Sequence, residues 1–391
     1  MSPFLTYSKH LVMKSNYKRL GDYIRQIDVR NRDLAVDNLL GLSISKQFIP
    51  SIANTIGTDM ANYKIVQPRQ FGYVPVTSRN GDKITVALYD GNTPCIISQA
   101  YIVFEVTDKD KLLPEYLMMW FRRPEFDRYS RFKSHGSARE VFEWEEMCEV
   151  MLPVPQIEEQ RKIVAEYQAV ERRIENNRRL ITTLEDAAQT IYRKMFVDNI
   201  DPNNLPQGWR MGKLGDVVEL SQGIQVEVED QFLDCQPEFN RFIRIIDYTP
   251  GTNEPPRYVN IKDKRYFCSE NEVSMIRYGD AGKVCRRLSG IIANNLFKIS
   301  PTESVTNNFI YYYLNDENMQ RIIRGSSASS TMPAITHKSI KELDCILPPQ
   351  DILRFFDNYV NPIEDDIMNR MGEIKSLRTI LNLILSKLSK L

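Results

Sequence analysis

The feature that most constrains this chain is a long heptad pattern that occurs twice. Residues 158–198 contain neither proline nor glycine, and their apolar side chains recur at alternating spacings of four and three. This spacing is typical of a helix that packs along a narrow seam against another helix. The pattern returns 193 residues later and runs to the C-terminus. The two seams are Ile163, Tyr167, Val170, Ile174, Asn177, Ile181, Leu184, Ala188, Ile191 and Met195, and Phe356, Val360, Ile363, Ile367, Arg370, Ile374, Leu377, Leu381, Ile384 and Leu388.

Two matching seams in one chain predict that the helices pack on each other as an antiparallel coiled coil. About 40 helical residues at 1.5 Å each make a rod of about 60 Å. The alternative is that each helix packs separately on its own domain. The polar seam positions, Asn177 and Arg370, are equivalent in the repeat. We interpret this polar pair as a device that fixes the register, because a polar seam residue costs stability but penalises slipped pairings.

The segments in front of the two helices repeat as well. Leu20-Gly21-Asp22 returns as Leu214-Gly215-Asp216, and residues 153–155 match the prolines at 348–349. SQAYIVF (98–104) resembles IANNLFKI (292–299), and 116–123 resembles 308–316. The sequence therefore predicts an α+β fold with a pseudo-twofold internal repeat of two similar mixed α/β domains, each followed by a long helix. The predicted parts are head 1 (1–155), a central helix (156–198), head 2 (199–349) and a C-terminal helix (350–391).

Composition excludes several classes of protein. Lys and Arg total 51, as do Asp and Glu, so the strongly basic surface of an indiscriminate nucleic-acid binder is absent. Six widely spaced cysteines without a CxxC pair, and three histidines, favour reduced thiols and do not support a structural zinc or other metal site. No apolar run approaches the ~20 residues that span a bilayer, and residues 4–13 lack a signal-peptide core. We therefore expect a cytoplasmic protein.

Two similar heads on paired helices suit a protein that contacts one ligand at two places. Because the pitch of B-DNA is about 34 Å, two heads on one side of a duplex can read half-sites about one turn apart. Further motifs are the two LGD entries, LLGLSISKQFIPS (39–51), YKIV (63–66), FGY (71–73) with Pro75, and LPVPQIEEQRKIV (152–164). On these motifs and their order, the chain resembles the specificity subunit of type I restriction–modification systems, from about Tyr17 to its end. The segment that leads into the second long helix departs from the pattern, since EQRK (159–162) becomes ILRF (352–355) and only the arginine matches.

The resemblance implies a non-catalytic DNA-recognition subunit. Each head would be a target-recognition domain that reads one half of a split, asymmetric double-stranded DNA target. The rod would set the gap and dock two methyltransferase subunits, which hold S-adenosylmethionine, and restriction subunits would join them. We expect no cofactor in this chain. GDAGK (279–283) is too short for a phosphate loop, and we expect it to be a turn after a strand at Val273–Ile276.

In head 1, candidate DNA-binding side chains flank two predicted loops. One is an expected hairpin turn at Asn80-Gly81, and the other lies in a basic, aromatic, Gly/Ser-containing stretch at 128–139. Such loops place hydroxyl and backbone donors on phosphates and an arginine in a groove. The candidates are Arg69, Ser78, Arg79, Asn80, Lys83, Arg131, Lys133, Ser134, His135, Ser137 and Arg139.

Head 2 carries a basic helix end followed by a Gly-Ser loop at the matching position, and a second basic cluster at 277–287. Gln222 is a further candidate, for contact with adenine, and the alternative is that it is a turn residue. A solvated surface loop is the alternative explanation for each of these residues. The candidates are Gln222, Arg277, Lys283, Arg286, Arg287, Arg324, Ser326, Ser327, Ser329, Ser330 and Thr331.

Regional charge bears on affinity. Head 1 has 20 basic and 18 acidic side chains, and head 2 has 17 and 19. Since phosphate neutralisation supplies much of the affinity for DNA, we expect the isolated chain to bind DNA weakly. The alternatives are a coiled-coil scaffold whose heads bind proteins, and a stand-alone nuclease.

Overall fold

The computed structural model describes residues 16–51, 57–78, 83–134, 140–249, 254–327 and 334–390. It divides into two compact units, and we describe each by itself. Unit 1 comprises residues 1–175 and 375–391, and unit 2 comprises residues 176–374. Each unit therefore combines one head with the segments of the two long helices on which that head packs.

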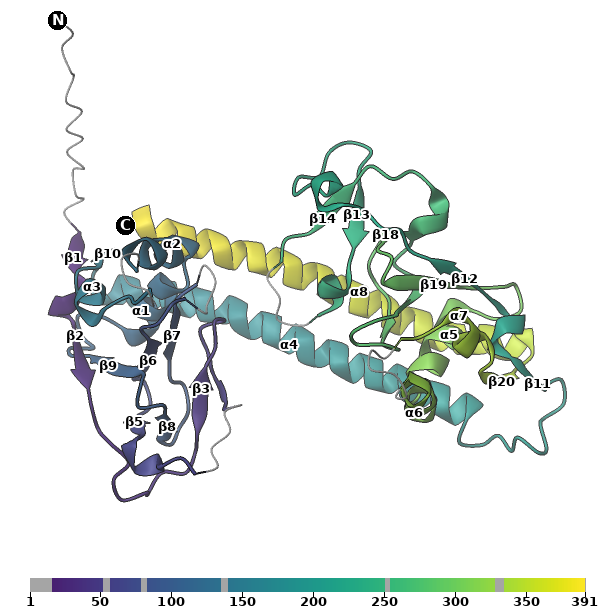
Figure 1. Ribbon diagram of the computed structural model, residues 1–391, viewed down its shortest axis with the longest axis horizontal. Helices are drawn as coiled ribbons and strands as arrows, with labels where there is room; N and C mark the ends of the chain where they lie inside the picture. The colour runs from purple at the N-terminus through teal and green to yellow at the C-terminus, as the bar shows by residue number, and fades with distance from the viewer. Residues whose placement is uncertain are drawn as a thin grey trace, which may run out of the picture. The chain divides into compact units, whose positions relative to one another are not determined.

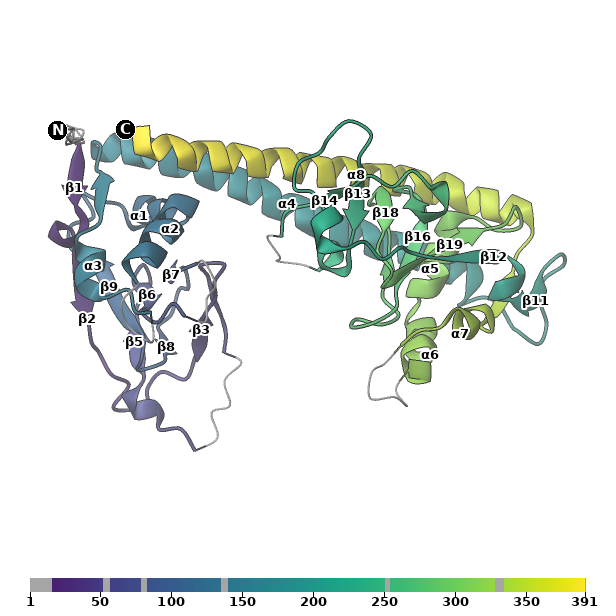
Figure 2. The same cartoon turned by 45° about the horizontal axis from the view of Figure 1, so that its top comes forward.

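The two long helices pair, as the seams predict. They are α4 (Ile157–Phe196) and α8 (Gln350–Lys387), which lie side by side in Figures 1 and 2. In unit 2, Asn177 contacts Arg370, and the ring of Tyr192 lies 6.1 Å from that of Phe356. Residue numbers thus rise along α4 as they fall along α8, so the pairing is antiparallel. The α8 helix continues through Pro362, although proline offers no N–H to a helical hydrogen bond.

Head 1 is built on a four-stranded antiparallel sheet in the order β2-β9-β6-β7. Three two-stranded pairs, β1-β10, β3-β4 and β5-β8, and three helices complete it. The strands are β1 (Tyr17–Arg19), β2 (Ile24–Ile27), β3 (Leu40–Leu42), β4 (Phe48–Pro50), β5 (Lys64–Val66), β6 (Phe71–Val74), β7 (Thr85–Leu88), β8 (Cys95–Ile97), β9 (Ile102–Val106) and β10 (Met151–Pro153). The helices are α1 (Pro114–Phe121), α2 (Pro124–Lys133) and α3 (Trp144–Cys148).

Head 2 repeats the order of the strands, but β14-β13-β18-β15 form one four-stranded sheet where head 1 has the pairs β3-β4 and β5-β8. Its main sheet has the order β12-β19-β16-β17, and β11 pairs with β20 as β1 pairs with β10. The strands are β11 (Arg210–Lys213), β12 (Val218–Gln222), β13 (Asn240–Ile243), β14 (Arg257–Val259), β15 (Phe267–Cys268), β16 (Val273–Ile276), β17 (Val284–Cys285), β18 (Gly290–Ile292), β19 (Leu296–Pro301) and β20 (Asp344–Leu347). The helices are α5 (Asn307–Asn315), α6 (Glu317–Ser327) and α7 (His337–Lys341).

Both LGD motifs form one turn of 3-10 helix at the entry of a head, η1 (Leu20–Asp22) and η3 (Leu214–Asp216). Leu20 and Leu214 are both fully buried, and their backbone N–H groups donate to Val150 and Leu343 at 2.8 and 2.9 Å. The repeated leucine therefore has the same packing and the same hydrogen bond in both heads. The expected strand at Val273–Ile276 is also confirmed, as β16.

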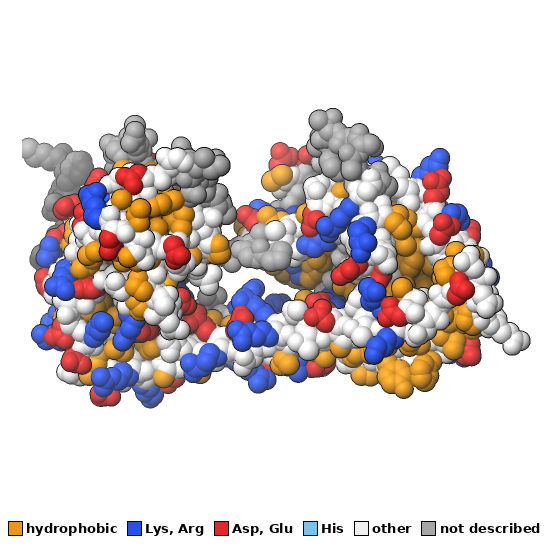
Figure 3. Space-filling model, turned by 90° about the horizontal axis from the view of Figure 1, so that it is seen from below, with side chains coloured by type: hydrophobic (Ala, Val, Ile, Leu, Met, Phe, Trp, Pro, Cys, Tyr) orange, Lys and Arg blue, Asp and Glu red, His pale blue; other side chains and the backbone are white. Residues whose placement is uncertain are grey.

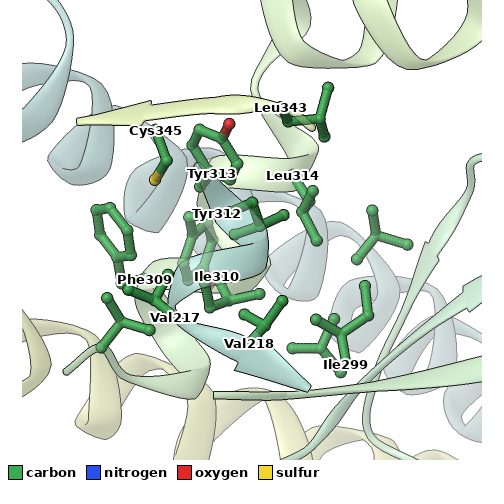
Figure 4. Close-up of a cluster of buried hydrophobic side chains, with 14 of the residues drawn as sticks. Val217, Val218, Ile299, Phe309, Ile310, Tyr312, Tyr313, Leu314, Leu343 and Cys345 are labelled. Carbon is green, nitrogen blue, oxygen red and sulfur yellow. The ribbon is translucent and has the colours of Figure 1, made fainter. Parts of the chain in front are cut away.

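The cores join each head to its own helix segments. In unit 2, the apolar face of α5 packs between the main sheet and the long helices, where Tyr312 and Phe309 meet Phe356 and Tyr192. Figure 4 shows the side of this core that faces β12, β19 and β20. In unit 1, Val164 and Tyr167 of α4 share a core with Leu385 of α8. This continuous apolar packing fixes each head on its own stretch of the helices.

Candidate nucleic-acid interface

In head 1, described residues that flank the two predicted loops lie at one edge. The β6–β7 hairpin and the stretch after α2 are joined by a bridge between Val76 and Val141. The N–H and hydroxyl of Thr77 both donate to the Glu140 carbonyl, at 2.9 and 2.6 Å. The residues that precede the predicted hairpin turn are thereby held against those that follow the predicted basic loop.

The basic end of α2 contributes to this edge. Arg131 and Lys133 lie in its last turn, where cations oppose the helix dipole. Arg131 pairs with Glu140, and the Lys133 Nζ lies 3.0 Å from Glu146. The hydrogen bond to Glu146 raises the pKa of Lys133. Partly exposed ion pairs of this kind are worth little, so a phosphate can replace these carboxylates as the partner.

Head 2 has the same arrangement. The tip of the β16–β17 hairpin bridges to the stretch after α6 through Tyr278 and Ala334. The N–H of Ile335 donates to the Arg277 carbonyl at 3.1 Å, and Gln320 of α6 donates to the Gly282 carbonyl at 3.1 Å. GDAGK forms the hairpin turn, as expected. Both of its glycines have positive φ, which a side chain rarely adopts.

Two predicted residues of head 2 are coupled at this edge. The Nη1 of Arg277 donates to the Gln222 Oε1 at 3.3 Å, and the guanidinium lies 5.0 Å from the Tyr278 ring. The Gln222 amide in turn donates to the backbone carbonyls of Leu296 and Asn294. Gln222 thus holds Arg277 beside the hairpin turn, while Lys283 donates to the Tyr248 carbonyl at 3.1 Å.

Helices α2 and α6 occupy equivalent positions, and their arginines coincide. Arg128 and Arg131 of α2 match Arg321 and Arg324 of α6 at the offset of 193 residues. Arg321 and Arg324 are exposed. The repeat therefore preserves a pair of arginines one helical turn apart at the same edge of both heads.

Three predicted residues lie away from these edges, and a fourth, Ser134, is the C-cap of α2. Arg69 precedes β6, at the end of that strand opposite the hairpin turn, and pairs with Glu115 of α1 at 2.7 Å. Ser134 is buried, and its hydroxyl donates to the Ser130 carbonyl. Arg286 and Arg287 follow β17, so a strand separates them from Arg277 and Lys283, and both are buried against the long helices. Both guanidiniums are thus paired inside unit 2, and their contact with DNA stays a prediction.

The remaining candidates fall into two groups. Ser78 is exposed and Lys83 is half-buried, one on either side of the hairpin turn. Ser326 and Ser327 lie in the last turn of α6. Outside the described residues are Arg79, Asn80, His135, Ser137, Arg139, Ser329, Ser330 and Thr331.

Sequence reasoning missed two features of head 1. Phe132, between the two basic residues of α2, is 76% exposed. Lys46 has a positive φ and buries its ammonium against Asp127 at 2.7 Å, and the same carboxylate accepts the Ile84 N–H at 3.1 Å. Burial lowers the pKa of Lys46. This pair ties the start of α2 to the β7 strand of the hairpin, but the sequence places its members 81 residues apart.

The surface charge is mixed. On the face shown in Figure 3, basic and acidic side chains are interspersed over the described parts of both heads. Among the described residues, no group of three or more His, Cys, Asp or Glu side chains could hold a metal ion. No helix in the described ranges is long and apolar enough to cross a membrane.

Comparison with known proteins defines the class. The family model of the type I restriction modification DNA specificity domain matches this chain twice, over residues 52–186 and 206–372. The chain belongs to this family: it is the DNA specificity subunit of a type I restriction–modification system and is non-catalytic.

Individual relatives span nearly the whole chain. The type I restriction enzyme MjaIX specificity subunit of Methanocaldococcus jannaschii is 23% identical over 367 residues, covering 84% of each protein. The putative MjaX specificity subunit of the same organism is 22% identical and covers 84% of this chain and 80% of that protein. The crystal structure of the type I restriction–modification S subunit from M. genitalium has the same fold, with a TM-score of 0.57, 14% identity, and coverage of 97% and 98%.

Proposed function

We propose that each head reads one half of a split DNA target and that the paired helices set the gap between the halves. The observation that carries this proposal is the duplication of the edge described above. In each head a bridge joins the hairpin to the stretch that comes after a helix with a basic C-terminal end. Arginines in such loops reach base edges and phosphates.

The helices also have features suited to docking. Along α8, Phe355 and Tyr359 are half-exposed in unit 2 with their rings 4.9 Å apart, and Ile380 and Leu383 are half-exposed in unit 1. Exposed apolar side chains that cluster on one element are typical of protein-binding surfaces. We propose that these faces dock two methyltransferase subunits, which carry S-adenosylmethionine, and that restriction subunits join this complex.

Methylation mapping tests the proposal. The chain would be expressed with the methyltransferase subunit of its own system in a host without DNA methylation, and modified adenines would be located by single-molecule sequencing. We expect a split motif with methyladenine in both halves and a fixed gap. Exchanging residues 17–155 for those of another specificity subunit should change one half only.

Point variants distinguish DNA reading from a scaffold role. Arg131→Ala and Arg324→Ala should each lower methylation of the motif, because each removes a basic group from one of the two equivalent edges. Arg25→Ala is the matched control, since Arg25 lies on β2 and pairs with Glu105. Absence of any methylation, with the partner active beside another specificity subunit, would instead favour a scaffold whose heads bind proteins.

A further inference from the structure

A buried ionic cluster joins head 2 to both long helices. The Nε and Nη2 of Arg287 donate to the two carboxylate oxygens of Glu364 on α8, at 2.9 and 3.1 Å. The Nη1 of the same guanidinium donates to Glu185 on α4. One side chain of the head therefore contacts both members of the helix pair. We call Arg287, Glu364 and Glu185 the head 2 clasp.

Neighbouring side chains extend the clasp. The hydroxyl of Tyr312 donates to Glu364 at 2.5 Å. Arg286 donates to the Asn308 Oδ1 at 2.7 Å, and the Asn308 amide donates to Asp357 and Asn361 of α8 at 2.9 and 2.8 Å. Head 2 is thus held on α8 by a series of directional bonds over two helical turns.

The clasp is not explained by stability alone. Buried ion pairs lose hydration as they form and are often no more stabilising than apolar residues of the same size. Arg287 also has a φ of 72°, a conformation that costs energy for a residue with a side chain. The apolar core of unit 2 already attaches head 2 to α4 and α8 through Tyr192, Phe309 and Phe356. What the bidentate pairing adds is a fixed orientation, because a guanidinium and a carboxylate bond well only in one plane.

Head 1 uses the equivalent glutamate in a looser way. Glu171 precedes Glu364 by 193 residues and accepts from Arg122, the C-cap of α1, at 2.6 Å. The Glu171 side chain is 38% exposed, whereas that of Glu364 is 7% exposed. The equivalent glutamate therefore accepts from an arginine of the head in both units, but the arginine comes from a different element in each. Only Glu364, in unit 2, is buried from solvent.

We propose that the head 2 clasp is a positioning device that fixes the orientation of head 2 on the rod and so restricts the gap that the subunit accepts. This inference rests on the proposed function. A change of one base pair in the gap moves a half-site by about 3.4 Å and turns it by about 35° around the duplex. A head held by planar bonds to both helices cannot follow such a turn, whereas a head held by apolar packing alone can tilt.

The test measures gap tolerance. Duplexes would carry the two half-sites of the mapped motif with the native gap or with gaps one or two base pairs shorter or longer. The methyltransferase complex would be assembled with the wild-type chain, with the double variant Arg287→Met/Glu364→Leu, or with Glu185→Ala. Lys213→Ala is the control, because it breaks an exposed ion pair with Asp344 in the same head.

We expect the double variant to raise methylation at gaps one base pair off, relative to the native gap, by at least about tenfold, with both half-site sequences unchanged. Glu185→Ala should shift the ratio in the same direction by less, and Lys213→Ala should leave it unchanged. If the double variant does not fold, Glu185→Ala is the deciding variant. The Glu185 side chain is partly exposed, so its removal should leave the fold intact. An unchanged ratio in a folded, active variant overturns the inference, whereas failure of the wild-type chain to direct a split motif overturns the proposed function as well.

Discussion

Replacing the polar pair within the helix seam should stabilise the protein, although it removes a hydrogen bond. Arg370 Nη1 donates to the Asn177 Oδ1 at 3.2 Å, and Arg370 also bonds Asp366 on its own helix. Asn177 is 1% exposed, and its Nδ2 has no hydrogen-bond partner. The pair thus leaves one amide donor buried and unsatisfied in an otherwise apolar seam.

The magnitude follows from these contacts. In the double variant Asn177→Leu/Arg370→Leu, relief of the unsatisfied donor contributes about 1–3 kcal/mol, and the hydrogen bond that is lost had contributed about 1.5–3 kcal/mol. Burial of a leucine at position 177 adds about 1.5–3 kcal/mol. The net expected gain is about 1–3 kcal/mol. Arg370→Leu alone should have the opposite sign and cost about 1–3 kcal/mol, because it leaves the Asn177 carbonyl oxygen unpaired as well.

Calorimetry and urea unfolding would measure the change in the free energy of unfolding. Thr183→Leu, on the exposed face of α4, is the control for added apolar surface. We expect the midpoint to rise for the double variant, fall for Arg370→Leu and stay nearly constant for the control. We also expect the double variant to permit slipped pairings, seen as disulfides between cysteines introduced one heptad out of register. A double variant less stable than wild type would refute the reasoning, because the pair would then be a net stabilising contact.

Three further predictions concern single sites. Burial is the largest single influence on the pKa of Glu364 and raises it, but the hydrogen bonds from Arg287 and Tyr312 and the charges of Arg286 and Arg287 together lower it by more, so the net pKa is lowered. The carboxylate therefore stabilises the fold above its unfolded pKa of about 4.3 and loses that effect as the pH falls through the folded pKa. Glu364→Gln should accordingly flatten acid unfolding followed by circular dichroism. Cys235 is the exposed cysteine of this chain, so a thiol reagent should label it first, and Cys235→Ser should remove the fast phase. Asp127→Ala should destabilise unit 1 by about 3 kcal/mol in urea unfolding, because it leaves the Lys46 ammonium buried without its carboxylate, whereas Lys46→Met/Asp127→Leu should cost much less.

Long-range order in the sequence predicted most of the architecture. The heptads identified the helix pair, and the offset between the two LGD motifs identified the equivalent heads, because both signals persist over many residues. The strand at Val273–Ile276 was recognised because three of its four residues are apolar and a Gly-containing turn follows. Short elements have no repeating pattern that identifies them in the sequence. The strand β17 has two residues, so the sequence does not show that Arg287 lies at the end of the hairpin opposite its turn.

The candidate site was predicted less well than the fold. Basic residues near a loop were correctly associated with the end of α2, but charge alone does not distinguish a solvated arginine from one that is paired in the interior. Arg131 and Arg287 look alike in the sequence, and only the carboxylates contributed by distant helices separate them. Lys46 was overlooked for the same reason, since its partner Asp127 lies far along the chain.

The ribbon at the base of each head has a consequence for how such a gene can change. Tyr17 pairs with Pro153, and Arg210 pairs with Leu347, so the chain enters and leaves each head at adjacent points. Head 2 lies between α4 and α8 and is a long loop whose two ends are already joined by the ribbon. The entropy of closing a loop grows only slowly with its length. Two recombination events, one in each strand of a ribbon, would therefore exchange one head for another of different size without disturbing the helices that carry it.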